Sequence, residues 1–460
     1  MKTVRYILFA FVGLVLLVSF YKGNVSASDN MEYKRKRLAQ ITEELKPDLS
    51  IKEGYVSQKK ETVKIVRNGK AVATVKLGEP VMVAQAEQEE KWGYFQFPGI
   101  GRTEDGKLIV SWQLSEDSHK AYGKGKSGYR MSSDEGKTWV PLDREYFTIG
   151  GRMLRLSNGN ILQVATPTSK DVSGYLSFPA PVYRDSLMKM DYYLESDLPD
   201  DLRGMYLCLR DSTGKRIKSF QGKLEDTGLL RYAIGGLLPI KWWGDMKELS
   251  DGSLIAGIYP SCYLKQKNEL PKSDVTFYKS VDEGCHWKKI GSIPFSIDKI
   301  KDPKRQYDRY QGFSEACFEI LRDCTFFCVM RSGYNTPMYK SFSYDKGHTW
   351  TKPEAFTPNG VKPRMLQLDN GVLVLASGRP GLQLRFCLDG DGKTWTGPIE
   401  MLPFMDENGN YDMWAVSCGY PRLLQAGNNT FYMVYSDFRT QNEHGEIRKS
   451  IIFRKITIVK

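Results

Sequence analysis

A short phrase that recurs along the chain limits the possible folds more than any other feature of the sequence. It reads Ser-x-Asp-x-Gly-x-Thr/His-Trp and covers residues 132–139, 280–287 and 343–350, and a looser copy ends at Trp395, with Cys387 at the serine position and an extra residue after Asp389. The aspartate of such a turn accepts hydrogen bonds from backbone N–H groups, glycine adopts a positive φ, and tryptophan packs between neighbouring units. We interpret this phrase, called the Asp box below, as a structural turn of a repeated unit.

A second periodic signal, two strand-like runs around a tight polar turn, occurs six times. The six hairpins are predicted over residues 100–112, 153–165, 246–259, 317–330, 365–376 and 423–435. Where an Asp box is found, it follows a hairpin within about thirty residues, so that one unit is two hairpins, or one four-stranded sheet. Such a sheet cannot bury both faces alone, whereas six sheets stacked radially can. The sequence therefore predicts an all-β chain that folds as a six-bladed β-propeller with Asp-box turns.

The N-terminus has the pattern of an export signal. Lys2 and Arg5 precede an uncharged run over residues 7–20, and a small-residue cleavage site ends at Ala27. The apolar run is too short to favour a membrane span, and no cysteine follows the signal closely enough for lipoprotein-type acylation. Residues 1–27 are thus predicted to be a cleaved signal peptide, which gives a periplasmic or secreted protein with no membrane span after cleavage.

The remaining chain divides into two parts in this interpretation. Residues 28–90 form an N-terminal extension, with a short helix over 30–47 followed by strands that can supply an outer strand to close the ring. Residues 91–460 form the propeller, in which residues 168–230 look like an elaborated blade. The absence of a Pro/Gly-rich linker favours one large β-domain over several small ones.

Charge and metal-ligand spacing narrow the possible partners. The formal net charge of +12 falls to +9, or 63 basic minus 54 acidic residues, once residues 1–27 are removed. This charge favours anionic partners in general, but no basic low-complexity run indicates nucleic acid. The four histidines lie far apart and form no zinc-ligand spacing with the cysteines, so neither a metal nor a cofactor is expected.

The predicted propeller brings certain residues to one mouth of its central channel. In each blade, the innermost strand starts at that mouth and the second strand returns to it, whereas the Asp boxes fall on the opposite face. Four arginines, several acids and a tyrosine at one rim suggest recognition of an anionic or polyhydroxylated ligand. These rim residues are Gln96, Arg152, Asp245, Glu315, Arg331, Arg364, Arg379, Tyr420 and Asp437.

The Asp boxes and the order of the six hairpins resemble the sialidase (neuraminidase) superfamily over about residues 91–460. In that family a glutamate opens the fourth blade and an arginine ends its second strand, as Glu315 and Arg331 do here. The family's next arginine corresponds to Arg379, and its tyrosine at the start of the last blade, ahead of a leucine, corresponds to Tyr420. The resemblance implies a propeller that acts on a glycan.

Two departures from the family pattern stand out. The Phe-Arg-Ile-Pro signature of the first blade appears here as Phe-Gln-Phe-Pro, so Gln96 replaces the first arginine of the carboxylate-binding triad. A missing charged hydrogen bond to a carboxylate costs about 1.5–3 kcal/mol. The family's acidic aspartate follows the first hairpin, where this chain has Glu116 and Asp117, and we assign the role to Asp117.

The resemblance implies a catalytic role for each of three residues. Tyr420 is the nucleophile, Glu315 the base that takes its proton, and Asp117 the acid that protonates the leaving oxygen. Sialidases are among the glycosidases that use a tyrosine in place of a second carboxylate, and a neutral nucleophile suits a sugar carbon that carries a carboxylate. Arg331, Arg379, Arg364 and Gln96 are the expected substrate-binding residues.

Three functions remain open at this point. The first is an exported retaining exo-glycosidase that removes a terminal sialic acid or a related acidic sugar from glycans. The second is an enzyme of the same fold, a lyase or another glycoside hydrolase, acting on a uronic-acid-containing polysaccharide. The third is a non-catalytic sugar-binding propeller, which would be favoured if Tyr420 and Glu315 did not meet.

Overall fold

The computed structural model describes residues 61–460, except 143–152, 187–188, 241, 267–268, 303–311, 334–335, 380 and 403–415. The expected signal peptide, the helix predicted over residues 30–47 and the rim residue Arg152 lie outside the described residues. The described part is all-β: it consists of strands β1–β31, joined by loops and single turns of 3-10 helix, and contains no α-helix. None of its helices is long and apolar enough to cross a membrane.

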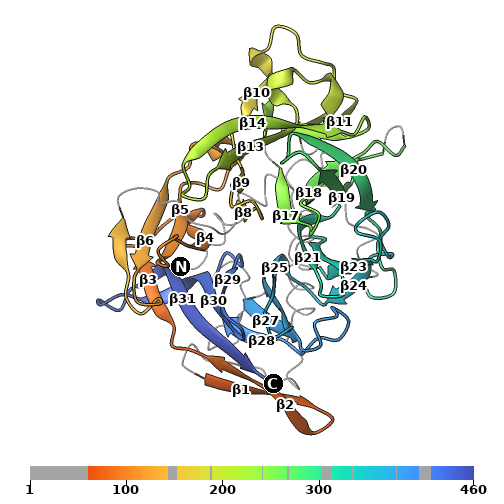
Figure 1. The fold of residues 1–460 in the computed structure, drawn as a ribbon. Helices are drawn as coiled ribbons and strands as arrows, with labels where there is room; N and C mark the ends of the chain where they lie inside the picture. Colours follow the sequence, from red (N-terminus) through yellow and green to blue (C-terminus); the bar gives the residue numbers. More distant parts are fainter. Residues whose placement is uncertain are drawn as a thin grey trace, which may run out of the picture.

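Three separate four-stranded sheets follow the chain in strict order, each built from neighbouring hairpins. Figure 1 shows the sheets of the molecule arranged around a common centre, with successive sheets side by side. The three sheets are β4 (Tyr94–Arg102), β5 (Leu108–Leu114), β6 (Ser127–Ser132) and β7 (Val140–Leu142); β21 (Ser314–Ile320), β22 (Phe326–Arg331), β23 (Met338–Ser343) and β24 (Glu354–Thr357); β25 (Val361–Gln367), β26 (Leu373–Gly378), β27 (Leu382–Cys387) and β28 (Ile399–Leu402).

The last sheet combines the two ends of the described chain. Strands β29, β30 and β31 pair in order, β31 also pairs with β2 and β3, and β1 pairs with β2. The N-terminal strands thus complete the sheet that the C-terminal strands begin. The bounds are β1 (Glu61–Arg67), β2 (Lys70–Leu77), β3 (Val81–Gln85), β29 (Arg422–Gly427), β30 (Thr430–Gln441) and β31 (Ile447–Val459).

A 13-stranded sheet fills the remaining part of the ring. It contains two runs, β8-β9-β13-β14 and β17-β18-β19-β20, which are joined by parallel pairing of β14 with β20. Five further strands extend this sheet and carry the chain segment that the sequence marked as elaborated. The bounds are β8 (Met153–Arg155), β9 (Ile161–Val164), β10 (Lys170–Asp171), β11 (Tyr183–Asp185), β12 (Met190–Leu194), β13 (Met205–Arg210), β14 (Arg216–Glu225), β15 (Leu230–Ile234), β16 (Leu237–Leu238), β17 (Trp243–Glu248), β18 (Leu254–Cys262), β19 (Ser273–Ser280) and β20 (His286–Ile293).

All six predicted hairpins form antiparallel pairs. They are β4/β5, β8/β9, β17/β18, β21/β22, β25/β26 and β29/β30. The turn glycines Gly106, Gly159, Gly252 and Gly371 all have positive φ, which is the conformation that a tight reversal needs. The hairpin signal in the sequence was therefore a reliable guide to where each sheet begins.

The three regular Asp boxes share one set of hydrogen bonds. In the first, the Ser132 hydroxyl donates to Asp134 and accepts from the Gly136 N–H, while Asp134 also accepts from Thr138. The Trp139 indole N–H closes the turn on the Gly136 carbonyl at 3.1 Å. The boxes of Asp282 and Asp345 repeat this pattern, so each turn satisfies its own backbone groups.

The sequence predicted that the box tryptophans pack between neighbouring units, and in the structure Trp139, Trp350 and Trp395 pack against the preceding sheet. Trp139 meets Phe453 of the last sheet at 5.3 Å, Trp350 stacks on Phe277 at 4.2 Å, and Trp395 stacks on Phe327 at 6.0 Å between ring centroids. Trp287 is fully buried, in a cluster with residues of β9 and β13. The boxes therefore join neighbouring sheets.

The fourth box corrects one detail of the sequence interpretation. Asp391, and not Asp389, acts as the box aspartate: it accepts from the Cys387 thiol at 3.3 Å and from the Lys393 N–H at 2.8 Å. Asp389 instead forms an ion pair with Arg67 at 3.0 Å. The one-residue insertion lengthens the turn, so the aspartate that reaches its backbone donors is Asp391, next to Gly392.

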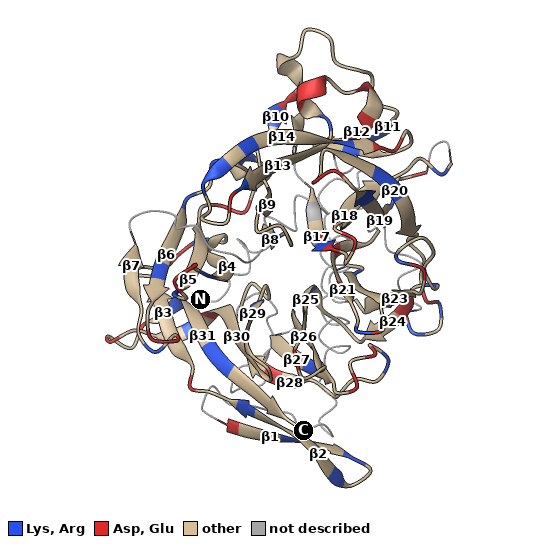
Figure 2. Ribbon diagram, in the orientation of Figure 1, with Lys and Arg blue, Asp and Glu red and all other residues tan. Residues whose placement is uncertain are grey.

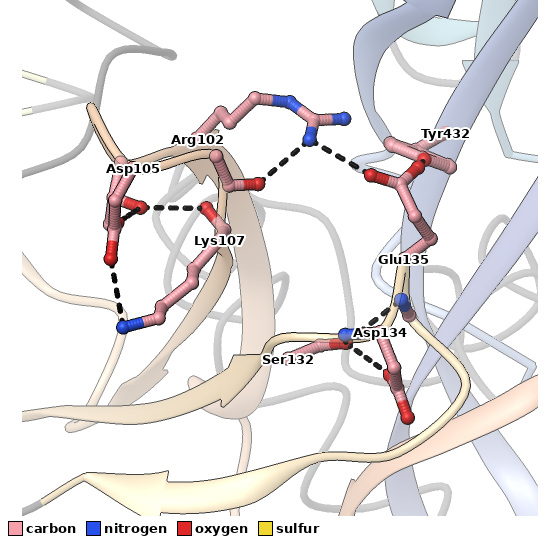
Figure 3. A network of polar contacts seen from close by, with 10 residues as sticks. Arg102, Asp105, Lys107, Ser132, Asp134, Glu135 and Tyr432 are labelled. Carbon is pink, nitrogen blue, oxygen red and sulfur yellow. Dashed lines mark hydrogen bonds and ion pairs between the residues drawn. The ribbon is translucent and has the colours of Figure 1, made fainter.

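A polar network ties the first sheet to the last and is drawn in Figure 3. Glu135, beside the first box aspartate, accepts from Arg102 at 3.1 Å and from the hydroxyl of Tyr432 on β30. The Arg102 guanidinium also lies 5.7 Å from the centre of the Tyr432 ring. Apolar residues of both sheets form one core beneath it. The two ends of the sheet series are thus in direct contact.

Replacing Asp345 by alanine is expected to destabilise the fold without touching the channel mouth. The change removes the acceptor of the Ser343 hydroxyl, the Thr349 N–H and the Thr349 hydroxyl. We expect a loss of about 1–3 kcal/mol in the free energy of unfolding. Urea unfolding would measure it, with Glu89→Ala on the exposed surface as the control. An unchanged urea midpoint for Asp345→Ala would contradict the role of the box.

Candidate functional site

The first strand of each of the three four-stranded sheets has a β-bulge near its start. In β4, β21 and β25 the register shifts by one residue, and Phe97, Glu315 and Lys362 lie in these bulges with φ between 48° and 52°. Non-glycine residues rarely adopt this left-handed conformation, and bulges re-aim side chains next to functional sites. The three bulges therefore place an aromatic ring, a carboxylate and an ammonium at equivalent positions of three sheets.

Glu315 and Tyr420 meet, although 105 positions separate them in the chain. The Tyr420 hydroxyl donates a hydrogen bond to Glu315 Oε1. Arg331 Nη1 reaches the same oxygen at 2.9 Å, and the backbone N–H of Lys362 donates to Oε2 at 2.9 Å. Both carboxylate oxygens are thus engaged, and the carboxylate, only 11% exposed, is held in one orientation toward the tyrosine.

Cations surround the Tyr420 ring. The Arg379 guanidinium lies 5.4 Å from the ring centre and the Lys362 ammonium 5.5 Å from it. Phe97 contacts the ring edge-on, with centroids 5.0 Å apart. With Arg331, the set carries three positive charges against the one negative charge of Glu315. The electrostatics of this site therefore favour an anionic group beside the tyrosine.

Two glycines bring the tyrosine against Arg379. A Cβ added at Gly378 would lie 2.1 Å from the Cα of Gly419, so the end of β26 touches the turn that precedes Tyr420. The Arg379 guanidinium donates from Nε to the Cys418 carbonyl of the same turn at 3.2 Å. This close backbone approach places the nucleophile candidate and the arginine side by side.

The protonation states of the pair are set by their surroundings. Burial acts to raise the pKa of Glu315, but the charges of Arg331 and Lys362 outweigh it and lower the pKa to about 2. Burial and the negative charge of Glu315 raise the pKa of Tyr420 well above its usual value. In the ligand-free site, Glu315 is therefore an ionised acceptor and Tyr420 keeps its proton.

Asp117 is connected to the same group through one side chain. It is exposed, and its Oδ2 accepts a hydrogen bond from the Trp92 indole N–H at 3.1 Å. The Arg379 guanidinium lies 5.6 Å from the centre of the Trp92 ring. Glu116, the other acid considered for this role, is exposed and lines a cleft beside the first sheet. The acid candidate thus borders the site through Trp92.

Two expected binding residues are engaged or enclosed within the protein. Gln96 is fully buried, and its amide atoms form no hydrogen bond in the described part of the chain. A ligand at the mouth would not contact it in this conformation. Arg364 pairs with Asp245 at 3.3 Å, and the charge of Asp245 opposes burial to raise the pKa of Arg364.

Sequence reasoning missed Lys362, Trp92 and Phe97. A signal for two of them was present, because Phe97 and Lys362 each precede a proline at the start of a first strand, as Tyr420 does. The residue before proline avoids the right-handed helical region, so such a pair marks a possible strand entrance but does not predict the positive φ found here. Lys362 also donates to the Tyr259 hydroxyl at 3.0 Å. Trp92 lies in the loop between β3 and β4 and had no such signal.

A cleft of about 570 Å³ adjoins the site over the first sheet. Its walls include Phe97, Glu116, the aromatic residues Tyr122 and Tyr129, and Arg422 from the last sheet. The combination of aromatic and polar side chains in a concave surface is typical of a small-molecule or sugar site. Across the described residues, no group of three His, Cys, Asp or Glu side chains is placed to hold a metal ion.

Comparison with known proteins supports the fold alone. No protein-family model and no curated protein sequence matches the chain. The solved structure of a protein of unknown function from Dyadobacter fermentans is 18% identical, with a TM-score of 0.58, and the match covers 84% of this chain and 99% of that one. The chain therefore shares the fold of that protein.

Two solved sialidases are more distant. The Hadza microbial sialidase Hz136 is 16% identical over 87% of this chain and 74% of its own, with a TM-score of 0.48. The NanB sialidase of Streptococcus pneumoniae is 14% identical over 82% of this chain and 70% of its own, with a TM-score of 0.43. These likenesses are too low to carry an argument about activity, which rests on the site geometry.

The ionised state of Glu315 predicts a difference in acid sensitivity. Its pKa is about 4.5 in the unfolded chain and about 2 in the fold, so its contribution to stability is complete above about pH 4.5 and is lost as the pH falls toward 2. Glu315→Gln lacks this contribution. The difference in free energy of unfolding between wild type and variant should shrink by about 2 kcal/mol between about pH 6 and about pH 3. Urea titrations at several pH values measure it, and a pH-independent difference would contradict the assigned pKa.

Proposed function

We propose that the protein is an exported retaining exo-glycosidase of sialidase type that removes a terminal sialic acid or a related acidic sugar from glycans. Tyr420 is the nucleophile, Glu315 the base that accepts its proton, and Asp117 the acid at the leaving oxygen. The hydrogen bond between Tyr420 and Glu315 carries the proposal, because it joins residues from two sheets in the one arrangement this chemistry requires.

The order of charge transfer follows from the two pKa shifts. Since the pKa of Tyr420 lies well above 10 and that of Glu315 near 2, a free phenolate is not present before the reaction. The proton therefore passes to Glu315 as the tyrosine oxygen forms its bond to the anomeric carbon and the leaving oxygen departs. Asp117 gives its proton to that leaving oxygen and in the second step takes one from water.

The positively charged side chains at the site are proposed to bind the carboxylate of an acidic sugar. Arg331 and Arg379 hold the sugar's carboxylate, and Lys362 supplies a third positive charge, in a site where Gln96 stands in place of the arginine of the family pattern. Lys362 is suited to this role because its backbone is fixed by Glu315 and its ammonium lies 5.5 Å from the Tyr420 ring. A point charge on a flexible stem accepts more than one carboxylate orientation.

The second candidate is an enzyme of the same fold that acts on a uronic-acid-containing polysaccharide, as a lyase or another hydrolase. Gln96 favours this candidate, because it stands where the family has the first arginine of the triad that binds the carboxylate of sialic acid. Its side chain is also fully buried, so it does not replace that contact. The cleft over the first sheet would then hold further sugars of the chain. A non-catalytic sugar-binding propeller is the remaining possibility.

The proposal also includes a six-bladed fold and export of the protein. The sheet series, with the two runs of the 13-stranded sheet counted separately, supports a six-bladed propeller whose last blade is closed by the N-terminal strands. Residues 1–27 are proposed to be the signal peptide, with cleavage after Ala27. Sequencing of the N-terminus of the secreted protein tests this, and a start far from Ser28 would contradict it.

The experiment that separates the candidates is a substrate panel. The purified mature protein is assayed with chromogenic glycosides of terminal sialic acids, uronic acids and neutral sugars, and with acidic polysaccharides. Release of an acidic terminal sugar with retention at the anomeric carbon, followed by NMR, supports the first proposal. Unsaturated products or internal cleavage of polysaccharide support the second, and turnover of none of them, together with saturable glycan binding, would contradict both.

Replacing Lys362 by methionine should weaken binding of acidic substrates more than turnover. The change removes the ammonium but keeps the backbone N–H that orients Glu315. Loss of one charged contact to a carboxylate should raise KM roughly tenfold to a hundredfold. Steady-state kinetics measure it, with Lys76→Met on the exposed face of β2 as the charge-matched control. Equal KM values in both variants would exclude Lys362 from substrate binding.

A further inference from the structure

A second pocket lies away from the first strands that carry the candidate site. Its volume is about 300 Å³, and it is lined by residues of β23, β24, β27 and the fourth Asp-box turn, together with Lys301. β23 and β24 are the third and fourth strands of one sheet and β27 is the third strand of the next, and they lie at the outer part of the ring in Figure 1. The pocket is therefore separate from the Tyr420 site.

A buried arginine lines this pocket, and no residue in the described part of the chain pairs with it. Arg385 is only 6% exposed, and none of the hydrogen bonds or ion pairs among the described residues involves its guanidinium, whose Nη1 is a buried unsatisfied donor. Burial alone lowers the pKa of Arg385 to about 10, so the group stays charged at neutral pH. A buried cation without a counter-charge is costly, and a bound anion would offset that cost.

The other side chains of the pocket fit the same ligand. Lys340 and Lys393 add two positive charges, and the one acid, Glu354, is already paired with Lys301. Lys340 lies 5.3 Å from the centre of the Phe356 ring, which with Trp395 forms an apolar wall. Lysine and arginine in Figure 2 are spread over all the sheets, so it is the buried Arg385 that distinguishes this place.

We propose that this pocket binds an oxyanion, a carboxylate, sulfate or phosphate group, with Arg385 as its central ligand and Lys340 and Lys393 beside it. The volume admits a free inorganic anion or the anionic group of one sugar residue, whose ring would lie on Phe356 and Trp395. The planar guanidinium suits a bidentate contact to such a group. The site binds without reacting and does not depend on the proposed glycosidase activity.

The test compares the full mature protein with Arg385→Met. Isothermal titration with sodium sulfate, sodium phosphate and glucuronic acid, at constant ionic strength, should give saturable binding to the wild type by one or more of these, and at least tenfold weaker binding to the variant. Which of the three binds tells a free inorganic anion from a sugar-borne one. Because sulfate and phosphate stabilise most proteins by exclusion from their surfaces, the readout is the difference between wild type and variant.

Two further variants keep the test decisive if Arg385→Met folds poorly. Lys393 is exposed, so Lys393→Met should fold normally and bind the anion several-fold more weakly, whereas Glu354→Gln removes a negative charge and should bind it more tightly. Lys76→Met serves as the control for net charge. Binding that is absent from the wild type, or equal in the wild type, Lys393→Met and Lys76→Met, would overturn the proposal.

Discussion

Tyr420→Phe is expected to lower turnover on the confirmed substrate by about a thousandfold or more, while KM and the free energy of unfolding stay close to those of the wild type. The change removes one hydroxyl, which donates to Glu315, and leaves the ring in its contact with Phe97 and its place beside Arg379. Because Arg331 and the Lys362 N–H still hold the Glu315 carboxylate, the free energy of unfolding should change little. Single-turnover kinetics and urea unfolding measure the two effects.

A matched variant tests whether the loss of any tyrosine hydroxyl would lower turnover. Tyr344 is 66% exposed and directly follows Ser343 of the third Asp box, outside the group of residues around Tyr420. Tyr344→Phe should retain wild-type turnover. Full activity of Tyr420→Phe would remove Tyr420 from the role of nucleophile and shift the account toward the lyase or the binding propeller.

Arg331→Met is expected to destabilise the fold by about 3–5 kcal/mol at neutral pH. Arg331 is 5% and Glu315 11% exposed, and the two are 2.9 Å apart, so the variant leaves a buried carboxylate without its main counter-charge. The same loss should raise the pKa of Glu315, since the Arg331 charge is the largest influence that lowers it. The penalty should therefore lessen as the pH falls and Glu315 becomes protonated, and urea unfolding at several pH values would detect this.

A double-mutant cycle separates the ion pair from the packing of the arginine stem. Adding Glu315→Gln to Arg331→Met removes the uncompensated charge, so the double variant should regain a large part of the lost stability. Strict additivity of the two single effects would mean that the pair does not interact in the folded protein. That outcome would contradict the contact on which the position of Glu315 rests.

The sequence was most informative where the chemistry of a residue is tied to a local turn. The Asp boxes and the polar hairpin turns specify their own hydrogen bonds, so the six hairpins and the packing of box tryptophans between neighbouring units could be predicted from spacing. Which neighbour each tryptophan meets, and the merging of two units into one 13-stranded sheet, could not. Spacing did not predict which aspartate acts in the fourth box, because either Asp389 or Asp391 could reach the turn. Only the distance to the backbone donors of the longer loop decides between them.

The site was predictable only in part for a related reason. Glu315, Arg331, Arg379 and Tyr420 lie at or next to the ends of strands, so the order of the strands was enough to bring them together. Lys362 and Phe97 reach the site through bulges with positive φ, which a strict alternation of side chains does not anticipate. Gln96 was expected at the mouth for its place in the family signature, but the same bulge in β4 leaves its side chain buried.

The most direct test of the central claim is the identification of the covalently modified residue. The protein is incubated with a fluorinated derivative of its acidic substrate that carries a good leaving group, so that the glycosyl-enzyme forms quickly and hydrolyses slowly, and the labelled peptide is identified by mass spectrometry. The account predicts one added glycosyl group, located on Tyr420 and absent from Tyr420→Phe. A label on any other residue, or steady turnover of the natural substrate with no label in the wild type, would contradict it.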